Sequence, residues 1–292
     1  EGHVPGGLAF ARGRVYATTG FAQVVALEAK TGAEVWRQAV PGPVRAPPTV
    51  RAGTVYVVTV DNQVFALDAD SGNQLWTYSG IAESAAILGG AAPAVDGGVV
   101  VVPFSSGEIV ALRTDTGRLL WSDSLASARR TDQVSTLAHI RGRPVIDRGR
   151  VFALSHGGIM VSIDLRTGRR VWERQIGGME TPWVAGDYLY VVTSDSEIAA
   201  LGRADGRILW VQSLPRWGNE AKKKDPIVWT GPVLASDRLI VAGSHGQALT
   251  ISPYTGDILG FEPMPDGVSV PPVVADGSVY FLANDADIVA YR

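Results

Sequence analysis

Residues 26–36 read ALEAKTGAEVW, and close copies of this phrase return along the 292-residue chain. The copies occupy residues 66–76, 111–121, 162–172, 200–210 and 250–260, and residues 288–292 form a last half-copy. Five of the phrases end in a tryptophan: Trp36, Trp76, Trp121, Trp172 and Trp210. The sixth ends in Gly260. A phrase that recurs over most of a chain indicates an array of one structural unit.

Each repeat predicts four short antiparallel strands. In the second repeat, Gly, Asn and Asp turns separate four apolar or β-branched runs, at residues 46–50, 55–60, 64–67 and 74–77. The glycine in each copy of the phrase suits a tight turn with positive φ. The tryptophan that ends the phrase has a large ring that can be buried against the neighbouring repeat. Four-stranded units of about 40 residues stacked radially form an all-β propeller. A β-solenoid is the alternative, but its repeats are usually shorter and lack a four-strand meander.

The repeats cover nearly the whole chain, which predicts a single propeller domain over residues 1–292. Seven repeats are visible, at residues 7–39, 46–79, 92–124, 143–175, 183–213, 231–262 and 270–292. The seventh stops at Arg292 after its third strand, and residues 7–10 already serve as the first strand of the first repeat. We therefore expect the closing strand to be absent and more residues to precede Glu1 in a parent protein.

Composition excludes several classes of function. The net charge of −3 gives no global attraction to nucleic acid or to an anionic membrane surface. The chain has no cysteine, which excludes disulfides, thiolate metal sites and cysteine nucleophiles. No apolar run approaches the ~18 residues that span a bilayer.

The polar residues give no pattern typical of an active site. The aspartates fall mostly in turns, where they bond to their own backbone. His156 and His245 each follow a serine, but in different repeats, and neighbours on a strand point to opposite faces, so neither pair indicates a nucleophile. We therefore predict no catalytic residue, no metal site and no bound cofactor.

The phrase resembles the tryptophan-docking repeat of pyrroloquinoline-quinone (PQQ) propellers. That repeat is used by quinoprotein dehydrogenases and by the BamB lipoproteins of outer-membrane β-barrel assembly. Residues 143–154, 162–168 and 271–280 look more like the BamB branch. The resemblance implies eight blades, an N-terminal lipid anchor upstream of Glu1, a place at the periplasmic face of the outer membrane of Gram-negative cells, and no enzymatic activity.

One turn carries the clearest partner hypothesis. Ile163 stands at an ordinary core position, whereas Leu165 stands where the other repeats have smaller or polar residues, namely Ala29, Ala69, Thr114, Arg203 and Pro253. An exposed leucine next to Arg166 is a plausible anchor for a partner. In BamB relatives this leucine–arginine element contributes to docking on a periplasmic domain of the barrel-forming subunit, so the resemblance implies a partner site at Ile163, Leu165 and Arg166.

A second candidate surface is made of the long connections between repeats, residues 79–92, 122–143 and 213–231. Loops of this length in a compact fold are often functional. Arg129, Arg130 and Trp217 are the candidate contacts there, and solvated loops with aromatic residues covering the blade edges are the alternative interpretation. These connections join fourth strands to first strands, so we expect them on the face opposite Arg166.

The sequence thus predicts a non-enzymatic scaffold that binds the periplasmic domains of the barrel-forming subunit and helps outer-membrane protein insertion. Its edge strands are also candidates to receive a strand from an unfolded outer-membrane protein client. Two alternatives stay open: a PQQ-dependent dehydrogenase-like quinoprotein, and a propeller scaffold of another periplasmic complex. Those dehydrogenases resemble one another in a vicinal cysteine pair over the quinone, which this chain lacks, and in oxygen ligands for Ca²⁺.

Overall fold

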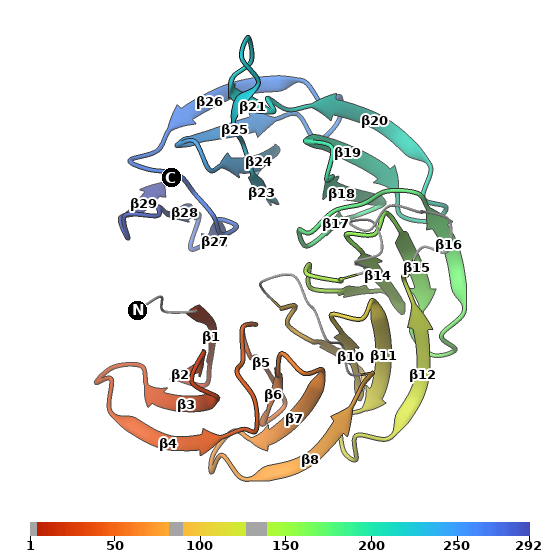
Figure 1. The fold of residues 1–292 in the computed structure, drawn as a ribbon, viewed down its shortest axis with the longest axis vertical. Coiled ribbons are helices and arrows are strands. Elements are labelled where there is room, and N and C mark those ends of the chain that lie inside the picture. Colours follow the sequence, from red (N-terminus) through yellow and green to blue (C-terminus); the bar gives the residue numbers. More distant parts are fainter. Residues whose placement is uncertain (1–4, 82–89, 127–138) are drawn as a thin grey trace. The chain divides into compact units, whose positions relative to one another are not determined.

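A computed structural model describes residues 5–81, 90–126 and 139–292 of the chain. These fall into two compact units, Glu1–Gln175 and Ile176–Arg292, each of which is described by itself (Figure 1). In the part of the chain that is described, no helix is long and apolar enough to cross a membrane. A single domain over the whole chain stays a prediction.

The N-terminal unit contains four antiparallel sheets of four strands, blades 1 to 4, in which strand order follows chain order. Blade 1 contains β1 (Pro5–Ala11), β2 (Arg14–Thr19), β3 (Gln23–Glu28) and β4 (Glu34–Ala39). Blade 2 contains β5 (Thr49–Arg51), β6 (Thr54–Val58), β7 (Gln63–Asp68) and β8 (Gln74–Ser79). Blade 3 contains β9 (Ala94–Asp96), β10 (Val99–Pro103), β11 (Glu108–Arg113) and β12 (Leu119–Ser124). Blade 4 contains β13 (Val145–Asp147), β14 (Arg150–Leu154), β15 (Met160–Asp164) and β16 (Arg170–Arg174).

The C-terminal unit contains blades 5 to 7 and one additional hairpin. Blade 5 contains β17 (Trp183–Ala185), β18 (Tyr188–Val192), β19 (Glu197–Gly202) and β20 (Ile208–Ser213). The hairpin contains β21 (Trp217–Asn219) and β22 (Lys224–Pro226). Blade 6 contains β23 (Trp229–Ala235), β24 (Arg238–Gly243), β25 (Gln247–Ile251) and β26 (Ile258–Pro263). Blade 7 contains β27 (Val273–Ala275), β28 (Ser278–Leu282) and β29 (Ile288–Tyr291), the three strands expected from the sequence.

The four-strand meander predicted for each repeat is confirmed, with one difference. The connection at residues 213–231 was expected to be a loop, but it carries the β21–β22 hairpin, and the first strand of blade 6 begins at Trp229 instead of Gly231. Trp229 is buried, so this aromatic residue of the connection belongs to the blade core.

The blades stack through apolar clusters shared by consecutive sheets. Tyr16 and Val24 of blade 1 join Val55 and Phe65 of blade 2 in one cluster. Similar clusters join blades 2 and 3, blades 3 and 4, blades 5 and 6, and blades 6 and 7. Within each unit, consecutive sheets therefore bury apolar faces against each other, as a repeat architecture requires.

The alanine or serine that begins the phrase pairs with the tryptophan on the adjacent strand. Ala66 pairs with Trp76 in blade 2, and a bulge follows between Ala66 and Leu67. The same pairing and bulge recur in blades 1, 3, 4 and 5. In blade 6 the sizes are exchanged, because Thr250 faces Gly260. The pair is complementary in volume, which explains why an alanine recurs at this position.

Four of the docking tryptophans, Trp36, Trp76, Trp121 and Trp210, donate a hydrogen bond to the next blade of their own unit. The indole Nε1 of Trp76 donates to the carbonyl oxygen of Thr114 over 2.8 Å, and that of Trp36 donates to the Ala69 oxygen over 3.0 Å. Trp210 donates in the same way to the Pro253 oxygen over 3.1 Å. These bonds satisfy a polar group that burial would otherwise leave without a partner.

Candidate partner-binding surface

The turn between β15 and β16 is held in shape by Asp164. Its Oδ1 accepts hydrogen bonds from the amide of Thr167 at 2.8 Å and from the Thr167 hydroxyl at 2.6 Å. These bonds, first that of the hydroxyl, lower the pKa of Asp164 below its ordinary value. The carboxylate therefore stays ionised at neutral pH and keeps the turn closed.

The backbone of Leu165 is fixed at both of its polar atoms. Its amide donates to the Gly149 oxygen over 2.9 Å, and its carbonyl accepts the Trp121 indole over 2.7 Å. Its side chain is half-buried and packs against the cluster that joins blades 3 and 4. Leu165 is therefore less exposed than expected, because the hydrogen bond from Trp121 holds its backbone against the core.

Ile163 is fully buried, with 0% of its surface exposed, in the same cluster. This confirms the interpretation of a core position. The side chain does not reach the surface, so it supports the turn from below and offers no area to a partner.

Arg166 is exposed at the tip of this turn. The Leu165–Gly149 hydrogen bond brings the β13–β14 turn alongside, and that turn carries the exposed Arg148. Arg169 is exposed on the same β15–β16 connection. The sequence analysis did not single out Arg148 and Arg169. The meander could have indicated them, because the first and third turns of a four-stranded meander lie at the same end of its sheet.

Arg170 lies at the start of β16, beyond the turn. Its guanidinium makes a two-point contact with Asp123 of blade 3, at 2.6 and 2.8 Å, and binds Glu173 at 2.5 Å. The Asp123 bond raises the pKa of Arg170 above its ordinary value. Arg170 therefore ties blade 4 to blade 3 and is committed within the molecule.

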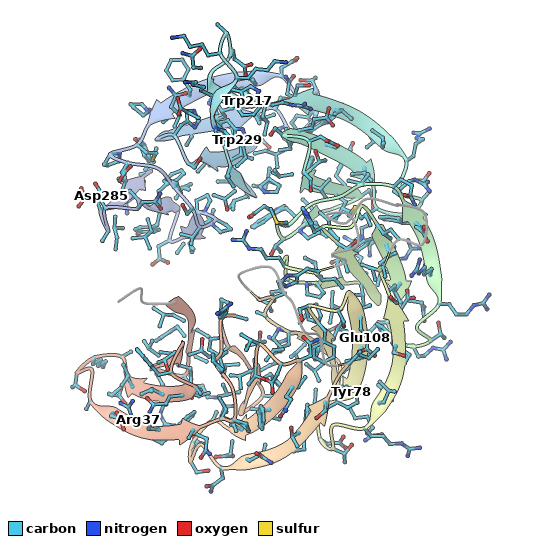
Figure 2. All side chains as sticks on the ribbon, in the orientation of Figure 1. Arg37, Tyr78, Glu108, Trp217, Trp229 and Asp285 are labelled. Carbon is cyan, nitrogen blue, oxygen red and sulfur yellow. The ribbon has the colours of Figure 1, made fainter. Side chains whose placement is uncertain are left out.

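The second candidate surface has one described part, the β21–β22 hairpin. In Figure 1 the hairpin extends outward beyond β20 and β26 of its own unit. Trp217 is half-buried at its base, where Glu220 Oε1 accepts its amide at 3.4 Å. Trp229, labelled beside it in Figure 2, instead donates its indole to the Pro215 oxygen over 2.8 Å. The exposed end of the hairpin carries Lys222, Lys223 and Lys224.

The other predicted contacts of this surface, Arg129 and Arg130, lie outside the described residues. The expectation that Arg166 and the long connections occupy opposite faces stays a prediction.

His156 and His245 lie at the turns after β14 and β24. His245 is exposed and meets the Trp229 ring edge-on, with centroids 5.2 Å apart. Within residues 5–81, 90–126 and 139–292, no group of three or more histidine, aspartate or glutamate side chains is arranged to hold a metal ion.

Comparison with known proteins identifies the fold. The crystal structure of BamB from Moraxella catarrhalis superposes with a TM-score of 0.86 and 22% identity, over 98% of this chain and 84% of that one. The quinohemoprotein alcohol dehydrogenase from Comamonas testosteroni gives a TM-score of 0.63 and 15% identity, over 96% and 70% of the two chains. The all-β PQQ-like propeller is therefore confirmed as the fold, and that fold is shared with an enzyme class.

The sequence comparisons identify the family. Residues 2–212 match the family described as outer membrane protein assembly factor BamB. The outer membrane protein assembly factor BamB of Salmonella typhimurium (strain LT2) is 32% identical over 288 residues, which are 98% of this chain and 71% of that protein. The resemblance in the repeat phrase is thus confirmed, and the chain belongs to the family of outer membrane protein assembly factor BamB.

Proposed function

We propose that this protein is a non-catalytic scaffold of outer-membrane protein assembly, at the periplasmic face of the outer membrane. Its partner is the periplasmic part of the barrel-forming subunit, and binding helps outer-membrane proteins insert. Membership of the BamB family supports the assembly role. The proposed contact with this partner is argued from the surface at the β15–β16 turn.

The observation that carries the proposed site is the rigid display of Arg166. The turn is fixed by Asp164 from within, by Gly149 from the adjacent turn and by the Trp121 indole from blade 3. A side chain on a fixed backbone loses less conformational freedom when it binds. With Arg148 and Arg169 nearby, the turn suits a partner surface that carries carboxylates.

The test is binding of the chain to the periplasmic domains of the barrel-forming subunit from the same organism, measured by surface plasmon resonance. We expect Arg166→Ala to weaken binding by about tenfold or more, because a central arginine contact typically contributes over 1 kcal/mol. The Leu165→Ala variant is tested for binding in the same way. Its melting temperature is also measured, because the Leu165 side chain packs against the core.

Lys30→Ala is the matched control, since Lys30 occupies the same position of the phrase in the first repeat and is also exposed. It removes one positive charge from an equivalent turn and should leave affinity within about twofold. If Lys222→Ala/Lys223→Ala weakens binding and Arg166→Ala does not, the contact lies on the hairpin instead. Absence of binding by the unaltered chain contradicts the proposed partner.

We also propose that the chain does not use a quinone cofactor. It has no cysteine for the vicinal pair of the quinoprotein dehydrogenases. Addition of PQQ and Ca²⁺ should therefore produce no dye reduction with alcohols or sugars, under conditions in which a quinoprotein dehydrogenase responds. Turnover in this assay would restore the enzymatic interpretation.

A second activity, binding of an extended client strand, is favoured by the fourth strands. In the sheet order each of these strands lies at an edge. The residue before each tryptophan is an exposed aliphatic side chain, as at Leu75 and Leu120. An edge with unpaired backbone groups and an apolar row suits strand addition. Peptides from barrel strands should slow amide exchange in β8 and β12, and unchanged exchange would contradict this activity.

A further inference from the structure

A small pocket opens in the N-terminal unit among connections of blades 2, 3 and 4. Its walls come from the β6–β7 and β10–β11 turns and from the segments that precede β5, β9 and β13. Arg45 and His139 lie on two of those segments, and Asn62 and Ser105 lie on the turns. No aspartate or glutamate is among the described residues that line it.

Two nitrogen atoms of the lining have no hydrogen-bond partner among the described residues. They are Nε of Arg45 and Nδ1 of His139, and both are shielded from solvent. Only 2% of His139 is exposed, so its free ring nitrogen is a buried polar atom. Such atoms usually carry a partner, because leaving one unpaired costs about 1–3 kcal/mol.

The neighbouring polar groups of the pocket are already committed. Asn62 donates to the Ile81 oxygen at 2.7 Å and accepts the Ser105 hydroxyl at 2.8 Å. Thr59 donates to Asp61, an exposed side chain that also accepts from Gln63. The free hydrogen-bonding capacity of the lining therefore lies on the Arg45 and His139 side chains, and Arg45 is a permanent cation.

The surroundings of His139 are positive as well. Its carbonyl accepts the amide of His156 at 3.0 Å, and His156 has a buried Nδ1 without a described partner. Burial, followed by the charges of Arg141 and His156, lowers the pKa of His139 to about 4. A site in which cations surround a neutral imidazole is short of negative charge, and a bound anion would supply it.

We propose that this pocket binds the carboxylate of a small acid or of an acidic side chain, held by the Arg45 guanidinium and the His139 imidazole. Its volume of about 40 Å³ exceeds the ~15 Å³ that one water needs by the same measure, so a group of a few atoms fits. This inference does not depend on the proposed function, because no residue of the β15–β16 turn lines the pocket.

The test follows His139 by nitrogen-detected NMR, which is practical because the chain has four histidines. Sodium acetate is titrated at about pH 6 against a sodium chloride reference of equal ionic strength. We expect the Arg45 Nε and His139 ring signals to shift together and to saturate. We also expect bound acetate to raise the pKa of His139, because the anion opposes the effect of Arg141 and His156.

Arg45→Gln should weaken acetate binding by about tenfold or more, since it removes the permanent cation of the pocket. Arg51→Gln is the matched control: Arg51 ends the strand that follows Arg45, and the same change there should alter affinity by less than about twofold. Because Arg45 is half-exposed, its replacement avoids the folding risk of changing the buried His139.

A blocked tripeptide with a central glutamate distinguishes the two sources of the carboxylate. Binding tighter than that of acetate indicates an acidic side chain of a polypeptide, whereas weaker binding indicates a small free acid, and both support the site. The proposal is overturned if acetate gives no saturable shift up to about 100 mM, or if Arg45→Gln and Arg51→Gln weaken binding equally.

Discussion

The glycine of the repeated phrase is required for two reasons, and only its turn conformation can be predicted from the sequence. Gly117 has a φ of +68°, which favours glycine, but a Cβ there would also lie 2.5 Å from Cε3 of Trp76. Gly72, Gly168 and Gly256 meet the preceding tryptophan in the same way. Gly32 has a similar φ of +72° and nothing within 4 Å. The first repeat therefore isolates the backbone effect from the contact with the indole.

We expect Gly117→Ala to lower the melting temperature much more than Gly32→Ala. The backbone strain, about 1 kcal/mol, is common to both, whereas displacement of the Trp76 ring adds a further ~2 kcal/mol at Gly117 only. Thermal unfolding followed by circular dichroism compares the two variants directly. Equal shifts would show that the glycine is required for turn geometry alone.

His139 should make stability depend on pH. Its pKa is lowered to about 4 in the fold, against an ordinary value of 6.5, with burial as the main cause. Between these two pH values the unfolded chain binds a proton at His139 and the folded chain does not. The contribution of the neutral His139 to the free energy of unfolding is therefore complete above pH 6.5 and is lost as the pH falls toward 4.

Melting temperatures recorded from neutral pH down to about pH 4 check this prediction. The profile of His139→Gln should be flatter than that of the unaltered chain in this window. His245→Gln is the control, because His245 is exposed, and its profile should follow the unaltered one. A His139→Gln profile as steep as the original would assign the pH dependence to other groups.

At the scale of elements, Asn62 joins three connections of the N-terminal unit. It sits in the β6–β7 turn with a φ of +60° and is 2% exposed. Its amide donates to the Ile81 oxygen, and its carbonyl accepts the backbone and hydroxyl groups of Ser105 in the β10–β11 turn. One side chain thus connects blade 2 to blade 3 at the end of their middle strands.

We expect Asn62→Ala to destabilise the chain by about 2–3 kcal/mol, because it leaves the Ser105 amide and the Ile81 carbonyl without a partner and puts alanine at positive φ. Asn73→Ala, at an exposed turn position, should change stability by less than about 0.5 kcal/mol. Denaturant titration of both variants makes the comparison. A small effect at Asn62 would mean that water replaces its bonds without loss.

The strands themselves were largely predictable from the pattern of residues. The run at residues 55–60 is rich in β-branched residues and bounded by turn residues, and β6 (Thr54–Val58) appears there. The β21–β22 hairpin was not predictable, because residues 217–226 include a run of lysines and lack alternating apolar positions. Its turn at residues 220–223 is closed by the amide of Lys223, which donates to the Glu220 oxygen.

At the scale of the whole molecule, the blades of each unit share apolar clusters with their neighbours in the chain. Trp76→Phe removes the bond to Thr114 and part of the contact with Gly117. We expect amide exchange to accelerate in blades 2 and 3 and to stay unchanged in blade 5, because repeat arrays lose stability locally. Hydrogen–deuterium exchange read by peptide mass spectrometry tests this. A uniform increase over all blades would show global cooperativity instead.

The candidate site was only partly predictable. Arg166 is exposed as expected, but the burial of Leu165 depends on the Trp121 indole, which reaches its carbonyl from the preceding blade. The Arg45–His139 pocket was not predicted, because its residues come from connections that are far apart in the sequence. Patterns within one repeat predict strands and turns, whereas these features arise between repeats.

The tryptophan bonds also set an order in time. Each acceptor follows its donor in the chain, by 33 residues for Trp36, 38 for Trp76 and 44 for Trp121. At synthesis rates of about 5–20 residues per second, the ribosome makes each tryptophan roughly 2–9 s before its acceptor. Until its acceptor is made, each of these tryptophans therefore has an indole that the next blade does not yet cover. Each such blade is complete only after its successor has been made.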